Sequence, residues 1–385
     1  MLIFLFTITI FSAANVYFYY KLSSLINSGT SVDILTGIVI LFMALSPFLI
    51  PVYSHRGSEK SVKIFSYAGY MWLAFLISFF PIGIILDLYN LVVRYGGSVS
   101  GHEFGSVILS SDRGFFIPLF LSFAINLYGY FEAKNLRIER LVIKTAKLPE
   151  GVDKVRIAQI SDLHLSIIVR DRILDKVIEK IRHEAPDIIV STGDLVDGII
   201  RHIGHLAERL KNMEARLGKY AIMGNHEVYG GIKHTTTFIE DSGFTLLRGN
   251  GVTVENIINI AGMDFNGMET RKYNRESPQK PEWEILSGLP AGLFTLLLKH
   301  RTDVEKRSLG LFDLQLSGHT HKGQIFPVNL ATMFMFPYHN GFTGLAKGSA
   351  IYASRGTGTA GPPVRFLAAP EITIIDIVST QSSEH

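Results

Sequence analysis

The chain has 385 residues, enough for more than one domain, and its formal net charge is only +3. It contains no cysteine, which excludes a disulfide scaffold, a cysteine nucleophile and thiolate metal ligands. Its basic residues are scattered instead of forming a stripe with interleaved aromatic residues, so we predict no nucleic-acid-binding surface.

Hydrophobic residues make up 47% of the chain, and they crowd its first third. Four stretches there carry no charged side chain, and each is close to the roughly 20 residues that a helix needs to cross a bilayer. They are 1–20, 34–53, 64–86 and 114–131. One such stretch could be a buried core helix, and the first could be a signal peptide. Four in a row predict a transmembrane region of about four helices over residues 1–133.

Lysine and arginine in the short loops indicate the orientation of this region, because cytoplasmic loops are enriched in them. The loops that follow the second and fourth stretches are the basic ones. The segment after the fourth stretch carries Lys134, Arg137, Arg140 and Lys144, whereas the opposite side has only Lys21, Arg94 and Arg113. We therefore expect an integral protein of the cell inner membrane with its C-terminal domain in the cytoplasm.

From residue 134 onward the pattern changes to strands that alternate with amphipathic helices. We expect strands at 136–144, 155–160, 188–191, 220–223, 294–298, 314–317 and 371–378, and helices at 170–183 and 205–217. A hairpin turn is expected at 249–251, and the polar segment 269–284 is expected to be a loop over a site. This order predicts an α/β domain over residues 134–385, a sandwich of two packed sheets flanked by helices.

Side chains that bind metals follow several of these strands, at the edge where α/β sheets place their ligands. They are Asp162, His164, Asp194, Asn225, His300, His319 and His321. Nitrogen and oxygen donors without sulfur suit Mn, Fe, Zn or Mg. The set is too large for one ordinary ion, but it fits two ions if one carboxylate bridges them. Two such ions would hold a phosphate and polarise a shared hydroxide.

Each of these pieces is a weak signal alone, but their order and spacing resemble the calcineurin-like metallophosphoesterases. The motifs that carry the resemblance are Asp162-x-His164, Gly193-Asp194, Gly224-Asn225-His226-Glu227, His300 and Gly318-His319-Thr320-His321. Gly323-Gln324-Ile325 and Ser354-Arg355-Gly356 also match. The resemblance covers residue 155 to the C-terminus. Within the family, the sequence is similar to the membrane-associated YkuE/YaeI-like branch.

The resemblance implies a role for each matched residue. Asp162, His164 and His321 would hold one ion, Asn225, His300 and His319 would hold the other, and Asp194 would bridge them. His226 would be the catalytic residue that protonates the leaving oxygen or steadies the phosphate. Asp197 and Glu227 would orient ligand imidazoles. Arg301 and Lys322 depart from the pattern of the relatives and could add a phosphate contact.

We therefore expect a membrane-anchored, metal-dependent phosphoric ester hydrolase with two divalent ions, Mn, Fe or Zn. It would cleave phosphate mono- or diesters, as a phosphodiesterase for example, and a lipid-linked phosphoester is an attractive substrate. A non-catalytic binding module stabilised by metal is the first alternative. A transporter with a regulatory domain is the weakest, because the predicted spans carry no charge.

Overall fold

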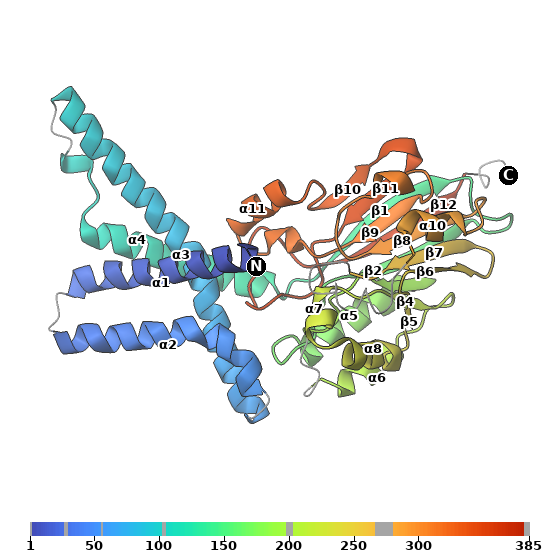
Figure 1. Cartoon of the computed structure of the whole chain (residues 1–385), viewed down its shortest axis with the longest axis horizontal. Coiled ribbons are helices and arrows are strands. Elements are labelled where there is room, and N and C mark those ends of the chain that lie inside the picture. Colours follow the sequence, from blue (N-terminus) through green and yellow to red (C-terminus); the bar gives the residue numbers. More distant parts are fainter. Residues whose placement is uncertain are drawn as a thin grey trace. The chain divides into compact units, whose positions relative to one another are not determined.

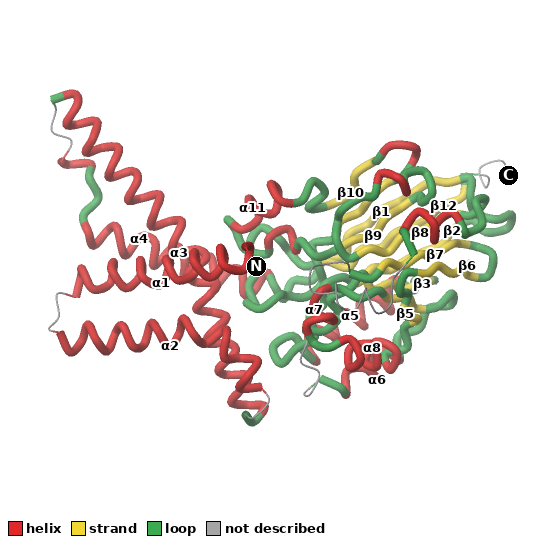
Figure 2. Tube along the Cα trace, in the orientation of Figure 1, coloured by secondary structure: helices red, strands yellow, loops and turns green. Residues whose placement is uncertain are grey.

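The computed structural model describes residues 2–26, 30–54, 57–101, 105–197, 203–265 and 280–380. The chain separates into two compact units. The helical unit contains Met1–Phe131, Ile325–Val328 and Gly361–Leu367, and the sandwich unit contains the remaining residues. Figure 2 distinguishes the two by their secondary structure, one formed of helices and the other built on strands.

The helical unit contains four long helices (Figure 1). They are α1 (Leu2–Ile26), α2 (Thr30–Ser54), α3 (Glu59–Ser100) and α4 (Ser111–Glu132). Within the described residues, three segments are long and apolar enough to cross a membrane: Thr30–Ile50, Glu59–Ser100 and Gly105–Glu132. The first predicted stretch, 1–20, does form a helix, but α1 is not among these three. The prediction of a helical, apolar N-terminal region is confirmed, with a small difference in the number of spans.

Helix α3 is much longer than the stretch 64–86 that the sequence predicted. Its 42 residues correspond to roughly 63 Å of helix, about twice the thickness of a hydrocarbon core. The helix continues through Asp87 because that carboxylate has partners on α1. Lys21 Nζ lies 2.5 Å from Asp87 Oδ1, and the Tyr17 hydroxyl donates to Oδ2 at 2.7 Å. The helix ends at Ser100 and is followed by Gly101, whose φ of 68° suits glycine.

The sandwich unit contains two six-stranded mixed sheets, with orders β1-β12-β2-β3-β4-β5 and β10-β11-β9-β8-β7-β6. The strands of the first sheet are β1 (Arg137–Thr145), β12 (Glu371–Ser379), β2 (Lys154–Ile160), β3 (Ile188–Ser191), β4 (Lys219–Ala221) and β5 (Thr245–Leu246). Those of the second are β10 (Gly341–Gly344), β11 (Ala350–Ala353), β9 (Leu314–Ser317), β8 (Phe294–Lys299), β7 (Ile258–Met263) and β6 (Asn250–Val254).

Helices cover the outer faces of both sheets and complete a sandwich of four layers (Figure 1). The helices of this unit are α5 (Asp171–Glu184), α6 (His205–Lys211), α7 (Asn225–Tyr229), α8 (Ile232–Asp241), α10 (Glu282–Ser287) and α11 (Val328–Met335). Apolar residues of α5, α6 and α8 pack on the first sheet, and those of α10 pack on the second. A separate cluster, which includes Ile157, Leu296 and Leu314, fills the space between the sheets. The predicted fold class is confirmed.

Two segments that were predicted as a turn and a loop, 249–251 and 269–284, have different outcomes. The segment 249–251 is not a hairpin turn, because β5 before it pairs in the first sheet and β6 after it pairs in the second. The hairpin closes later, between β6 and β7, where Glu255 and Asn256 both have positive φ. Asparagine tolerates this left-handed conformation better than most residues. Most of the predicted loop 269–284 lies outside the described residues, and its end forms the start of α10.

The strand directions bring the candidate ligands to common sheet edges. Strands β2, β3 and β4 are parallel to one another, so their carboxyl ends lie at the same edge. Strands β8 and β9 are also parallel, and their carboxyl ends share an edge of the second sheet. The residues that follow these five strands are therefore the ones that the sandwich can assemble into a site.

Candidate metal centre

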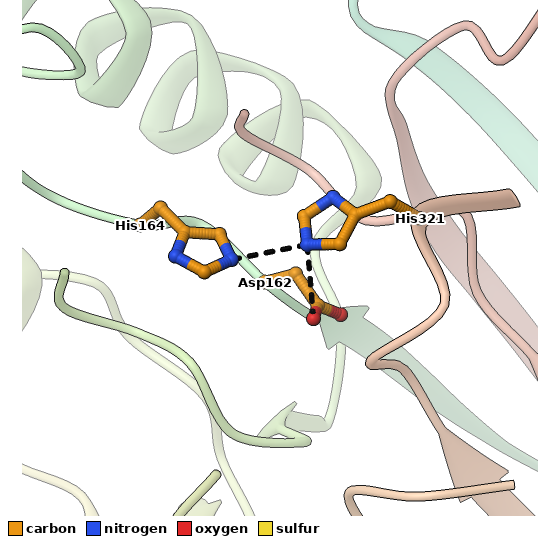
Figure 3. Close-up of side chains that lie close together, drawn as sticks. All are labelled: Asp162, His164 and His321. Carbon is orange, nitrogen blue, oxygen red and sulfur yellow. Dashed lines mark hydrogen bonds and ion pairs between the residues drawn. The ribbon is translucent and has the colours of Figure 1, made fainter. Parts of the chain in front are cut away.

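The first cluster of candidate ligands joins the two sheets. Asp162 and His164 follow β2 in the first sheet, whereas His321 follows β9 in the second. Figure 3 shows the three side chains pointing toward one another. His321 Nε2 lies 3.0 Å from His164 Nε2 and 3.4 Å from Asp162 Oδ1. All three side chains are buried, so several donor atoms converge on a point shielded from water.

A second cluster contains Asn225, His300 and His319. Asn225 Oδ1 lies 3.1 Å from His300 Nε2 and 2.9 Å from His319 Nδ1. The two ring nitrogens are 3.1 Å apart. Asn225 is the first residue of α7, a short helix that the sequence analysis did not predict.

Asp194 lies against both clusters. Its Oδ2 atom is 3.7 Å from His164 Nε2 in the first cluster and 3.3 Å from His300 Nε2 in the second. The fold thus brings all seven predicted ligands together, with the carboxylate that was predicted to bridge in the middle. In the described part of the chain, metal-binding atoms within 4.8 Å of one another occur in three groups, and Asp194 belongs to two of them. The roles of these residues as ligands stay a prediction.

A hydrogen bond to the backbone fixes the orientation of the His300 ring. His300 Nδ1 is 2.8 Å from the carbonyl oxygen of Thr192, which can only accept. That nitrogen therefore carries a proton, and Nε2 is the nitrogen that faces Asp194 and Asn225. A histidine whose second nitrogen is fixed by a backbone carbonyl, beside carboxylates, is typical of metal sites. The residues present therefore fit divalent cations.

The backbone around the site is strained. Asp162, His164, Asp194, His319 and His321 all have φ between 48° and 70°, a region that few non-glycine residues occupy. Such conformations persist where surrounding contacts impose them, and they cluster at functional sites. Gly224 and Gly318 allow the close packing, because a Cβ at either position would overlap a carboxylate oxygen of Asp194 or Asp162.

Both buried carboxylates are held in their charged form. Burial acts to raise the pKa of Asp162, but the charge and hydrogen bond of His321 outweigh it and bring the pKa well below its usual range. Burial acts on Asp194 in the same way, and there His300 lowers the pKa. The backbone N–H of His319 also donates to Asp162 Oδ1 at 2.9 Å. Two anions in one buried site demand a compensating positive charge.

His226 lies beside the clusters, at the edge that is open to solvent. Its Nδ1 is 2.6 Å from Asp197 Oδ1, and its ring centre is 4.6 Å from that of His164. Burial acts to lower the pKa of His226, but the hydrogen bond with Asp197 and the charge of Asp194 raise it to about 9. Asp197 therefore orients the ring of His226, which is not a predicted ligand. Its Oδ1 is 3.6 Å from Nδ1 of His164, the predicted ligand closest to it, so a role in orienting a ligand stays a prediction.

Glu227 has a different function from the predicted one. Its Oε2 accepts hydrogen bonds from the backbone N–H groups of Asp194 at 2.8 Å and Gly224 at 2.7 Å, and Oε1 accepts from Val196 at 3.1 Å. The carboxylate thus orients no imidazole in the described contacts. It ties the loop after β3 to the turn that begins α7, which holds Asp194 and Asn225 in place.

Sequence analysis missed the side chains that line the second cluster. The ring centres of Phe265 and Phe336 lie 6.1 Å and 5.6 Å from that of His319. Nothing near these residues in the sequence marks them, because neither lies in a motif. Arg301, predicted as a possible phosphate contact, has its guanidinium 6.0 Å from the centre of the Phe336 ring, which leaves it at the border of this cluster.

Comparisons with known proteins agree with this geometry. The calcineurin-like phosphoesterase family matches residues 155–323, a range that holds every candidate ligand. An uncharacterized metallophosphoesterase of Aquifex aeolicus (strain VF5) is 35% identical over 67% of this chain and 98% of the relative. The uncharacterized metallophosphoesterase YkuE of Bacillus subtilis (strain 168) is 34% identical over 66% and 90%.

A third relative extends the similarity into the helical unit. A transmembrane protein with metallophosphoesterase domain from Danio rerio is 29% identical over 88% of this chain and 79% of the relative. The resemblance to the membrane-associated branch is therefore confirmed, and together with the three apolar segments it indicates membrane association. The chain belongs to the calcineurin-like metallophosphoesterase family.

Proposed function

We propose that the chain is a membrane-anchored phosphohydrolase that cleaves phosphate mono- or diesters at a centre of two divalent cations. The observation that carries the proposal is the position of Asp194, whose Oδ2 is 3.7 Å from His164 and 3.3 Å from His300. A carboxylate shared by two histidine clusters is the arrangement that a pair of ions requires. Membership of a phosphoesterase family supports the reaction class.

The ligands divide between two ions. Asp162, His164 and His321 would hold one ion, Asn225, His300 and His319 the other, and Asp194 both. The nitrogen and oxygen donors suit Mn, Fe or Zn. When bound, such a pair supplies a hydroxide nucleophile at neutral pH and neutralises charge that develops on the phosphate. The buried position of Asp162 and Asp194 strengthens their attraction for these ions, because few waters compete.

His226 is the residue that we assign to the leaving group. Its Nδ1 is hydrogen-bonded to Asp197 at 2.6 Å, so Nε2 is the nitrogen that can deliver a proton to the departing oxygen. Its side chain is 29% exposed, which gives an incoming phosphoester access to it. Asp197 fixes the orientation of the ring and stabilises its protonated form.

The lipid bilayer is the partner that we assign to the helical unit. Three apolar segments and a relative named as a transmembrane protein support this assignment. We assign this unit to the cell inner membrane, and the basic residues of the segment after α4 favour a cytoplasmic position for the sandwich unit. Anchoring of this kind places the centre near phosphoesters at the membrane.

Hydrolysis assays on the full chain in detergent test this proposal. We expect turnover of bis-p-nitrophenyl phosphate or p-nitrophenyl phosphate with Mn²⁺, and loss of that turnover on chelation. Metal analysis of the same sample is expected to give two ions per chain. His226→Ala should keep the metal and lose most of the turnover. A wild-type protein that binds two ions and hydrolyses neither compound would instead support the non-catalytic binding module.

A further inference from the structure

Helix α11 (Val328–Met335) is apolar, yet none of its residues is buried. Leu330, Met333, Phe334 and Met335 are 46%, 52%, 92% and 54% exposed. The sequence of the helix, VNLATMFM, contains no charged side chain. A contiguous apolar surface of this kind is unusual on a domain that faces only water, and it marks a contact with another apolar phase or surface.

The chain before α11 leads from the helical unit, and the chain after it contacts the loop that carries His319 and His321. Residues Ile325–Val328, which lead into α11 and include its first residue, belong to the helical unit. The residue immediately after it, Phe336, has its ring centre 5.6 Å from that of His319. A little further on, the carbonyl of His339 accepts a hydrogen bond from the Thr320 hydroxyl at 2.7 Å. The chain after α11 is thus fixed to the loop that carries His319 and His321.

The dimensions and composition of α11 favour a lipid surface as its partner. Its eight residues form a helix of roughly 12 Å, much too short to cross the ~30 Å hydrocarbon core. A short uncharged helix can instead dip about 5–10 Å into the boundary between headgroups and acyl chains. Residues 325–328, at the N-terminal end of α11, group with apolar helices that need a bilayer, so such a surface is available within the reach of the chain.

We propose that α11 inserts into the bilayer surface and brings the loop of His319 and His321 to the membrane, so that the enzyme acts on phosphoesters carried by lipids. The second half of this inference rests on the proposed phosphohydrolase function, and the first half does not. A lipid-borne substrate keeps its tail in the bilayer beside α11 while its phosphate enters past Phe336. The lipid tail thus selects the substrate, and the ligands act only on the phosphate.

Insertion is measured without any assay of activity. Because the natural chain has no cysteine, Phe334→Cys gives a single site for an environment-sensitive nitrobenzoxadiazole label. The matched control is Val142→Cys on β1, another apolar position in the sandwich unit that is 60% exposed. Both full chains are reconstituted in phosphatidylethanolamine–phosphatidylglycerol vesicles with 5-doxyl phosphatidylcholine as the quencher.

We expect the label at position 334 to be quenched at least about twofold more strongly than the label at 142, since it should lie at the depth of the nitroxide. Equal quenching at both positions would overturn the insertion. A blue shift of the 334 label in detergent without lipid, growing with protein concentration, would also overturn it, because α11 would then be covered by a second copy of the chain.

Substrate selection is tested with two compounds that share a leaving group. Hexadecyl p-nitrophenyl phosphate is embedded in vesicles, and bis-p-nitrophenyl phosphate is in solution. Removing two apolar side chains with Met333→Ser/Phe334→Ser should lower kcat/KM on the embedded compound about tenfold or more. The soluble compound should be hydrolysed at the wild-type rate, and Val142→Ser should change neither.

The outcomes separate the inference from the function on which it rests. An equal loss on both compounds would mean that α11 supports the fold of the site, and lipid selection would be wrong. A wild-type chain that hydrolyses neither compound but shows strong quenching at position 334 would contradict the phosphohydrolase function while membrane insertion stands.

Discussion

The helical unit and the sandwich unit place the same apolar residue types in opposite environments. Leu296 and Leu314 of the sandwich unit are fully buried, whereas Ile38 and Leu41 of α2 are each 59% exposed. Exposed apolar surface costs about 25 cal/mol per Å² in water, so the helices are stable only where lipid replaces water. Burial must therefore be judged against the solvent of each unit. Helix α11 belongs to the sandwich unit, but it exposes apolar side chains as the helices of the helical unit do.

Buried polar side chains show a second difference between the units. In the sandwich unit Asp162, Asp194 and His300 converge on one point, where their charges oppose or attract one another. In the helical unit Asn126 Nδ2 on α4 donates to the carbonyl of Ala74 on α3 at 3.4 Å, and Asn15 on α1 accepts from the Trp72 indole on α3 at 3.0 Å. Isolated bonds of this second kind hold helices together in membranes. We therefore expect catalysis to depend on the first kind alone.

The largest effect should come from replacing the carboxylate shared by the two clusters. Asp194→Asn removes one charge from the centre of the site, so we expect turnover of a chromogenic phosphodiester to fall on the order of 10³-fold or more. Metal content, measured on the same sample, should fall as well. Asn126→Ala, which removes a buried polar side chain from the helical unit, is the control and should keep turnover within about twofold of wild type. Comparable losses in both variants would erase the distinction between the units.

A core truncation tests the difference in apolar environment. Leu296→Ala leaves a cavity between the sheets and should lower the free energy of unfolding of the sandwich unit by about 2–5 kcal/mol. Leu41→Ala removes an exposed side chain from α2 and should change this free energy by less than about 0.5 kcal/mol. Urea titration in micelles is followed by Trp283 emission in a Trp72→Phe background, since the chain has two tryptophans. Similar destabilisation by both truncations would contradict the difference in apolar environment between Leu296 and Leu41.

Much of this fold is predictable from local sequence patterns. A continuous apolar run locates β3, and alternating apolar residues locate β9, both at their observed bounds. Each strand is followed by a small or polar residue that marks its end. The turn between β6 and β7 escaped prediction, since glycines at 249 and 251 suggest a hairpin more strongly than Glu255-Asn256 does. The length of α3 also escaped, because Lys21, the partner that accommodates Asp87, lies 66 residues away.

The candidate site also has some features that the sequence predicts and others that it does not. The donor chemistry and strand-end position of Asp162 and His321 are visible in sequence, so their convergence could be anticipated. The contacts of Glu227 could not, because the donors to its carboxylate are backbone N–H groups, and every residue except proline has one. The proximity of Phe336 to His319 could not be predicted either, since only the return of the chain after α11 brings the two rings together.

Glu227→Gln should have an intermediate effect. An amide keeps one acceptor oxygen but places an NH₂ group against a backbone N–H, so the hydrogen bonds to Asp194 and Gly224 or the one to Val196 are lost. We expect metal affinity or activity to fall about 10–100-fold, as for other residues that support ligands. Glu240→Gln on the exposed surface of α8 is the matched control. Wild-type metal affinity and turnover in Glu227→Gln would show that Asp194 needs no such support.

The smallest effect concerns an ion pair outside the site. Arg156 donates from Nε and Nη2 to the two carboxylate oxygens of Asp376 at 2.7 Å and 2.9 Å, and this hydrogen bonding lowers the pKa of Asp376 despite partial burial. A lowered pKa in the folded state means that the pair stabilises the fold above the unfolded pKa of about 3.9, and that this stabilisation is lost as the pH falls through the folded value.

Asp376→Asn should therefore lower the free energy of unfolding by about 0.2–1 kcal/mol at pH 7. The gap between wild type and variant should close as the pH falls below about 3.9, and 1 M salt should narrow it at pH 7 because the pair is partly exposed. Urea titrations over this pH range measure the gap. If it stays constant into the acid range, the Asn substitution acts through packing and the charge of Asp376 contributes nothing to stability.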